Sequence, residues 1–183
     1  DIDDILPGLL EGRRRVHYHL GRDAEFDLKL IGWLNRVRAQ ARQGAQPPQE
    51  FLELGHLLDE MRLFKSADEV KLMQRAADIS VHAHRAAMRA ARAGIHEYEL
   101  QAEVERVFRM HDAQPAYGSI VGTGANACVL HYRDNNAKSR DGELVLIDAG
   151  AEYRGYAADI TRTFPVNGRF TGPQKAVYEV VLA

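Results

Sequence analysis

The chain has 183 residues, 45% of them hydrophobic and 27% charged, which is typical of a folded globular protein with room for one substantial domain or two small ones. A formal net charge of −2 gives no indication of a nucleic-acid or membrane-surface partner, and no apolar run is long enough to span a bilayer. The single cysteine, Cys128, excludes an internal disulfide and is compatible with a reducing compartment, so we expect a cytoplasmic protein.

The first third of the chain alternates helical and strand-like segments. Asp1–Gly12 predicts a short helix, Val16–Leu20 a strand, and Asp23–Arg42 a helix with apolar residues at helical spacing. A loop is indicated at Gln43–Gln49, and Phe51–Leu58 favours neither helix nor strand. This region is interpreted as the end of a small α/β domain.

A domain boundary is predicted just before Ser66. Ser66 and Glu69 have the spacing of a capping box, which begins a long helix that runs to about Arg92. We therefore divide the chain into a first domain, 1–64, and a second domain, 65–183. The apolar side of the long helix is predicted to consist of Val70, Met73, Ala77, Val81, His84 and Met88.

The middle of the second domain predicts a second helix and then two strands. The helix spans about Glu97–His111, and the strands are Gly118–Gly124 and Cys128–Tyr132. The latter strand contains His131, and a single histidine in an apolar strand is usually structural. Cys128 and His131 are three residues apart on a predicted strand and so point to opposite faces, which argues against a nucleophile–base pair.

Two acids interrupt the most hydrophobic stretch of the second domain. Leu144–Ile147 is an apolar run typical of a buried strand, and Asp148 follows it directly. A tight turn is predicted at Glu152–Gly155, followed by a strand, Tyr156–Phe164, that contains Asp159. If the turn centres on its two middle residues, the two carboxylates are a directly opposed cross-strand pair with Cβ atoms about 4.5–5.5 Å apart.

Two ionised carboxylates this close repel each other, and three arrangements relieve the repulsion. One acid can keep its proton, Arg162 can neutralise the pair, or a divalent cation can bind between them. For an isolated pair we would favour a turn cap or a salt bridge to Arg162. Because this pair interrupts an otherwise apolar strand, we favour the cation.

Five motifs occur in order from the domain boundary onwards. They are MRLFKSADEV (Met61–Val70), IVGTGAN (Ile120–Asn126), LHY (Leu130–Tyr132), RDGELVLIDAG (Arg140–Gly150) and GYAADITRTFPVNG (Gly155–Gly168). In identity and spacing they resemble the Xaa-Pro aminopeptidases (aminopeptidase P) of the metal-dependent pita-bread peptidases. The resemblance implies an α+β fold in which 65–183 is the first half of a pita-bread catalytic domain and 1–64 is the C-terminal part of an N-terminal α/β domain.

The resemblance also implies roles for four residues. Asp148 corresponds to a terminal metal ligand, and Asp159 to the carboxylate that bridges two divalent ions, typically Mn²⁺. His131 corresponds to a catalytic pocket histidine that contacts substrate and stabilises the tetrahedral centre without binding metal. Tyr117 corresponds to a substrate-binding tyrosine near the metal pair. The implied activity is release of the N-terminal residue from peptides with proline in second position, by a water that two metal ions activate.

The resemblance covers only part of what that activity needs. The family uses two Asp, one His and two Glu as metal ligands, and only the two Asp are present. Because the chain starts without Met and ends within a predicted helix, we expect a piece of a longer protein that is inactive alone. A half domain would expose an apolar sheet, so we also expect a homo-oligomer or a partner piece.

Four alternatives remain at this stage. Prolidase, which cleaves Xaa-Pro dipeptides, shares the LHY and DITRTFP motifs, and its distinguishing residues would lie after Ala183. Methionine aminopeptidase lacks an α/β domain before the helix at Ser66. Pita-bread domains without metal serve as peptide- or histone-binding modules or as creatinase-like enzymes, and the presence of both Asp148 and Asp159 argues against these two.

Overall fold

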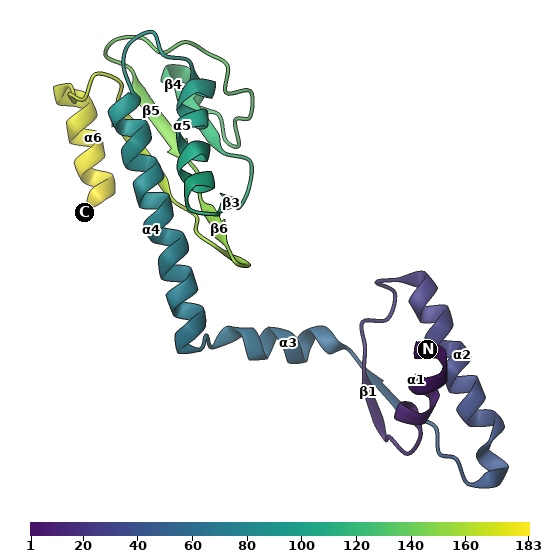
Figure 1. Cartoon of the computed structure of the whole chain (residues 1–183). Helices are drawn as coiled ribbons and strands as arrows, with labels where there is room; N and C mark the ends of the chain where they lie inside the picture. Colours follow the sequence, from purple (N-terminus) through teal and green to yellow (C-terminus); the bar gives the residue numbers. More distant parts are fainter. The chain divides into compact units, whose positions relative to one another are not determined.

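The computed structural model describes residues 1–183 as two compact units, Asp1–Lys65 and Ser66–Ala183 (Figure 1). The sequence-based boundary lay between residues 64 and 65. Each unit has its own hydrophobic core, and no helix combines the length and apolar character needed to cross a membrane.

The first unit is a small α/β assembly. Its core consists of Leu10, Leu30, Trp33, Leu34, Val37 and Ala45, and its two short strands pair in parallel. Trp33 Nε1 donates a 2.7 Å hydrogen bond to Asp3 Oδ1, which ties the helix Ala24–Ala39 to the helix Ile2–Leu10. The elements are α1 (Ile2–Leu10), β1 (Arg15–His17), α2 (Ala24–Ala39), the 3₁₀ turn η1 (Ala41–Gln43), β2 (Glu50–Leu52) and α3 (Leu54–Leu63).

The second unit begins with the helix pair α4 (Ala67–Ala90) and α5 (Glu97–Met110). The capping box that the sequence predicts is confirmed, because Glu69 N donates to Ser66 Oγ at 3.3 Å and Ser66 N donates to Glu69 Oε2 at 2.6 Å. The predicted second helix is also confirmed, and its buried residues include Leu100, Val104, Val107 and Phe108.

The predicted apolar side of α4 is only partly right, because His84 is buried but four of its other members are exposed. Val70, Met73, Val81 and Met88 are between 37% and 53% exposed. The physical reason is that small side chains let neighbouring elements approach the α4 backbone closely. The face of α4 that packs against them is therefore made mostly of small residues and not of the most hydrophobic ones. The buried face consists of Ala76, Ile79, Ser80, Ala83, His84, Ala86 and Ala87.

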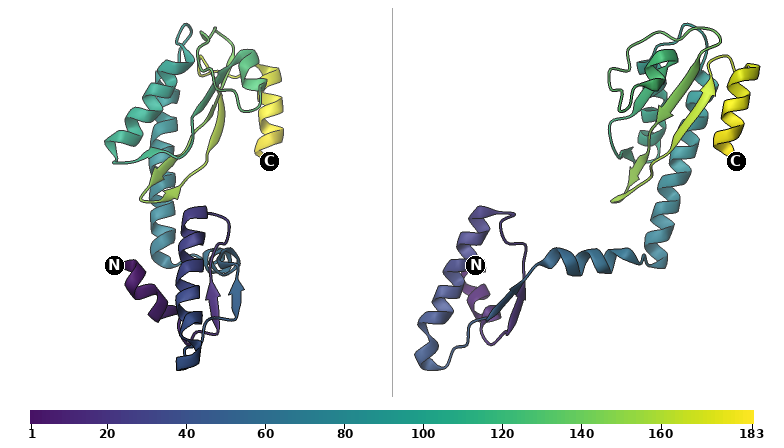
Figure 2. Two further views of the ribbon diagram at one scale, coloured as in Figure 1. Left: turned by 90° about the vertical axis from the view of Figure 1, so that its right-hand side faces the viewer. Right: turned by 180° about the vertical axis from the view of Figure 1, so that it is seen from behind.

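Two antiparallel three-stranded sheets complete the second unit. One has the order β3 (Gln114–Pro115), β6 (Ala151–Tyr153), β7 (Tyr156–Ala157), and the other β4 (Ile120–Thr123), β5 (Leu144–Asp148), β8 (Thr161–Pro165). Helices α4 and α5 cover one face of the strands, and the right-hand view of Figure 2 looks onto the opposite face. The 3₁₀ turn η2 (Gly124–Cys128) follows β4, and α6 (Gly172–Leu182) ends the chain.

The long hairpin has a different register from the predicted one. Its turn centres on Arg154 and Gly155, which both adopt positive φ (50° and 85°), as a type I′ turn requires. Asp148 therefore pairs with Thr161. The prediction that Asp148 and Asp159 are directly opposed is therefore wrong. The observed partner of Asp148 lies two residues beyond the predicted partner, Asp159. Because side chains alternate between the two faces of a strand, a shift of two residues leaves both acids on the same side of the ribbon, as diagonal neighbours.

The predicted strand Cys128–Tyr132 is also wrong. Gly124, at φ 53°, turns the chain out of β4, and local turn hydrogen bonds then replace a ladder, with Val129 N donating to Asn126 O and Tyr132 N to Val129 O. Leu130 is 86% exposed, so the apolar character of this segment does not reflect burial. His131 consequently lies on a loop, in the left-handed region at φ 56°.

Candidate functional site

The face of the β4–β5–β8 sheet that points away from α4 and α5 bears the candidate site. Alternation along β5 buries Val145 and Ile147 beneath the helices and places Leu146 and Asp148 on the other face. A depression of about 290 Å³ lies there, lined by Leu146, Asp148, Thr161, His131 and the segment before that histidine. The structure thus brings His131 and Asp148 to the same cavity.

The two acids meet at the hydroxyl group of Tyr117. Tyr117 Oη lies 2.6 Å from Asp148 Oδ1 and 3.0 Å from Asp159 Oδ1. A phenol has one proton, so it cannot satisfy two carboxylates with full hydrogen bonds at once. Neither carboxylate takes part in an ion pair, and Arg162 instead donates to the carbonyl of Thr161 at 2.7 Å. The negative charge of the pair is therefore uncompensated by protein cations.

Tyr117 stays protonated in this setting. Burial raises the pKa of its phenol, and the hydrogen bonds to Asp148 and Asp159, together with their negative charges, raise that pKa further. The hydroxyl therefore remains a donor throughout the neutral range and keeps the two carboxylates converged.

The oxygen atoms gathered here fit part of a divalent-cation site. Carboxylate oxygens are the ligands that hard cations prefer, and a cation would supply the positive charge that the pair lacks. The chain contains no group of three or more His, Cys, Asp or Glu side chains that could hold a metal ion. Asp148 and Asp159 thus suit two positions of a ligand set without completing it.

A sharp crossing at Gly150 makes the convergence possible. A Cβ atom at this position would lie 1.7 Å from the carbonyl oxygen of Ala158, so only glycine allows the two backbones to pass. Ala149 N donates to Ile160 O at 3.1 Å on one side of the crossing, and Ala158 N donates to Ala151 O at 2.9 Å on the other. These two bonds fix Asp148 and Asp159 relative to each other.

Helix α4 holds the same crossing from beneath. Ser80 Oγ accepts a 2.9 Å hydrogen bond from Ala151 N, and His84 Nε2 lies 3.1 Å from the carbonyl oxygen of Ala149. The two side chains are one turn apart and both are buried. Burial lowers the pKa of His84, so its imidazole is neutral and donates to that carbonyl. Sequence reasoning assigned His84 to an apolar helix face and missed Ser80. The indication that the sequence offered was two polar residues at i, i+4 on the predicted helix, and both are buried in the structure.

His131 differs from the other site residues in having no hydrogen bond of its own. Its neighbour Tyr132 is anchored instead, through a 2.8 Å hydrogen bond to the buried carboxylate of Glu97. Sequence reasoning did not single out Glu97, because an acid in the first turn of a helix is ordinarily a solvent-exposed partner of the helix dipole.

Comparison with known proteins gives one family and a set of similar chains. The model of metallopeptidase family M24 matches residues 71–183. An Xaa-Pro aminopeptidase of Escherichia coli is 44% identical over 183 residues, which is 100% of this chain and 42% of that protein. An Xaa-Pro aminopeptidase of Haemophilus influenzae is 50% identical over 134 residues, covering 73% of this chain and 31% of that protein.

Solved structures give the same result for the fold. Pseudomonas aeruginosa aminopeptidase PepP superposes with a TM-score of 0.92 at 60% identity, covering 100% of this chain and 41% of that one. A variant of Escherichia coli aminopeptidase P in complex with substrate superposes with a TM-score of 0.90 at 44% identity, covering 99% and 41%. The α+β architecture expected from the sequence is confirmed, and the chain spans about two fifths of the length of these structures.

Proposed function

Because the chain belongs to metallopeptidase family M24, we propose that the whole protein is a metal-dependent aminopeptidase that releases the N-terminal residue from peptides with proline in second position. The observation that supports this most strongly is the convergence of Asp148 and Asp159 on one hydroxyl group, without a protein cation beside them. The similar chains named Xaa-Pro aminopeptidase support the substrate class.

We propose Asp148 as a terminal ligand and Asp159 as a bridging ligand of two divalent ions, with Mn²⁺ as the metal. The remaining ligands would come from the part of the whole protein outside these 183 residues. When bound, such a metal pair supplies an activated water and polarises the scissile carbonyl group.

Two further residues of this chain have assigned roles in the proposal. Tyr117 Oη, 2.6 Å from Asp148 Oδ1, orients the carboxylates and borders the substrate position. His131 lines the depression beside Asp148 with its imidazole free, so it can donate a hydrogen bond to the substrate carbonyl oxygen as negative charge develops there. His131 is therefore the proposed catalytic and substrate-binding group.

The setting of the enzyme is also a proposal. Cys128 is an exposed free thiol, which suits the reducing cytoplasm. The exposed apolar residues of α6, among them Val180 and Val181, suit a protein whose domain continues or associates, and we propose a homo-oligomer.

The test is a specificity assay on the whole protein supplied with Mn²⁺. We expect release of the first residue from an Xaa-Pro-Xaa tripeptide, and loss of that activity in D148N and in D159N. R162Q is the matched control, because Arg162 lies on the next strand without contacting either carboxylate, and it should retain activity. Cleavage of an Xaa-Pro dipeptide alone would replace the proposal with prolidase activity.

A further inference from the structure

Glu97 accepts five hydrogen bonds from one short segment of the chain, which runs from the end of β4 into the loop that follows it. Its side chain is completely buried although it lies at the first position of α5. The donors, in chain order, are Thr123 N (2.7 Å), Thr123 Oγ1 (2.9 Å), Asn126 Nδ2 (3.1 Å), Tyr132 Oη (2.8 Å) and Ala137 N (2.9 Å). Every donor belongs to residues 123–137, the segment that contains His131.

The carboxylate of Glu97 is ionised in this position. Burial alone would raise its pKa, but the hydrogen bonds from Thr123, Ala137, Asn126 and Tyr132 outweigh burial and lower it. A buried charge without a counter-ion is stable only when donors surround it, so the loop and the carboxylate depend on each other.

The bonds to Glu97 reach the residues that set the position of His131. Thr123 lies at the start of the segment 123–137, Tyr132 directly follows His131, and Ala137 lies at the end of the segment. His131 itself has positive φ, an unfavourable conformation for a residue with a side chain, and its imidazole has no hydrogen bond. Its direction is therefore set by its anchored neighbours.

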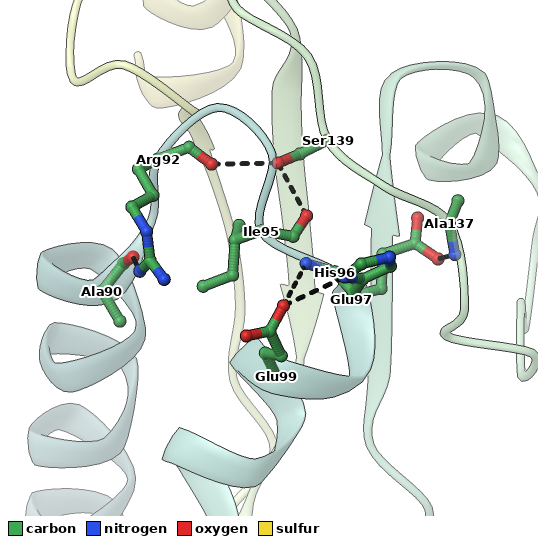
Figure 3. Close-up of polar contacts among 8 residues, drawn as sticks. All are labelled: Ala90, Arg92, Ile95, His96, Glu97, Glu99, Ala137 and Ser139. Carbon is green, nitrogen blue, oxygen red and sulfur yellow. Dashed lines mark hydrogen bonds and ion pairs between the residues drawn. The ribbon is translucent and has the colours of Figure 1, made fainter.

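The far end of the loop has separate anchors. Asn135 Oδ1 accepts from Val121 N at 3.0 Å, and its Nδ2 donates to Ser119 O at 2.8 Å. Ser139 Oγ lies 3.1 Å from Arg92 O and 2.9 Å from Ile95 O, as Figure 3 shows beside the contact between Glu97 and Ala137. Loss of Glu97 should consequently release residues 124–133 while residues 135–139 stay in place.

We propose that Glu97 is a positioning residue: its carboxylate fixes the loop so that His131 faces the depression beside Asp148. The role of His131 in this inference rests on the proposed peptidase function, whereas the anchoring of the loop does not. Glu97 touches neither Asp148, Asp159 nor Tyr117, so it acts only through the loop.

The kinetic test is a double-mutant cycle in the whole protein. E97Q presents an amide donor where acceptors are needed, and Y132F removes two bonds, the one that Tyr132 Oη donates to Glu97 and the one that it accepts from Asn126 Nδ2. Each should lower kcat/KM, E97Q by about 10- to 100-fold, because small displacements of a catalytic group have effects of that size. In an H131A background, E97Q should cost less than about twofold more, because the two residues act as a unit. E99Q, two residues along α5 and bonded to His96, is the control and should match wild type.

Amide hydrogen exchange provides a readout that does not depend on activity. E97Q and Y132F should accelerate exchange in residues 124–133 and leave α5 and the amide of Ser139, which donates to Ile95 O, protected. If wild type has no peptidase activity but this pattern appears, the proposed function fails and the anchoring stands. Unchanged exchange, full activity of E97Q and Y132F, or an equal loss with and without His131 would each overturn the inference. Should E97Q not fold, Y132F carries the same comparison.

Discussion

Replacing Gly150 with alanine tests how the structure brings the two acids together. The new Cβ atom would lie 1.7 Å from Ala158 O, whereas contacts below 3.0 Å essentially do not occur, so the backbones must separate by about 1.3 Å, the difference between the two distances. The opening would disrupt the flanking bonds Ala149 N to Ile160 O and Ala158 N to Ala151 O. At about 0.5–1.5 kcal/mol for each of the two bonds plus about 1–3 kcal/mol for overpacking, we expect G150A to lose roughly 2–6 kcal/mol of unfolding free energy.

The measurement is urea denaturation of the whole protein as wild type and as G150A, with Mn²⁺ affinity determined on the same samples. The matched control is G172A, because Gly172 also lacks positive φ and a Cβ there meets no atom within 4 Å. G172A should remain within about 0.5 kcal/mol of wild type. A G150A protein as stable as G172A, with unchanged Mn²⁺ affinity, would refute the reasoning.

Two further predictions concern groups around the acids. Y117F removes the one proton between Asp148 and Asp159, so the metal-free protein should lose about 1–3 kcal/mol of unfolding free energy in urea denaturation, and added Mn²⁺ should recover most of it; equal stability with and without the hydroxyl would contradict this. Burial lowers the pKa of His84 from its ordinary value of 6.5, so below that pH the unfolded chain binds a proton that the folded chain excludes. The unfolding free energy should therefore fall as the pH drops below 6.5 and be fully present above it, and H84Q should reduce that dependence; an identical pH profile for H84Q would show that another group causes it.

Local rules predicted some elements well. The capping box of Ser66 and Glu69 involves four adjacent residues, and its geometry is independent of the rest of the fold. The interruption of an apolar strand by Asp148 can likewise be recognised from the residues of that strand alone. Both features could be found because their causes lie within a few residues of sequence.

The remaining features depend on contacts between distant segments. The hairpin register was missed by two residues because Arg154 adopts a left-handed conformation, which turn propensity alone does not favour for arginine. Cys128–Tyr132 has strand-like residues, but no neighbouring strand pairs with it. Glu97 binds Thr123 and Ala137, 26 and 40 residues away, so no local pattern could identify it.

The most direct test of the metal-centre proposal is calorimetric titration of the metal-free whole protein with Mn²⁺. Wild type should bind two ions, D159N should lose both because Asp159 is the proposed bridge, and D148N should lose at least one. The isolated 183-residue chain should bind weakly or not at all. Two tight sites in D159N, or in the isolated chain, would contradict the assignment of Asp148 and Asp159 as part of a larger two-metal site.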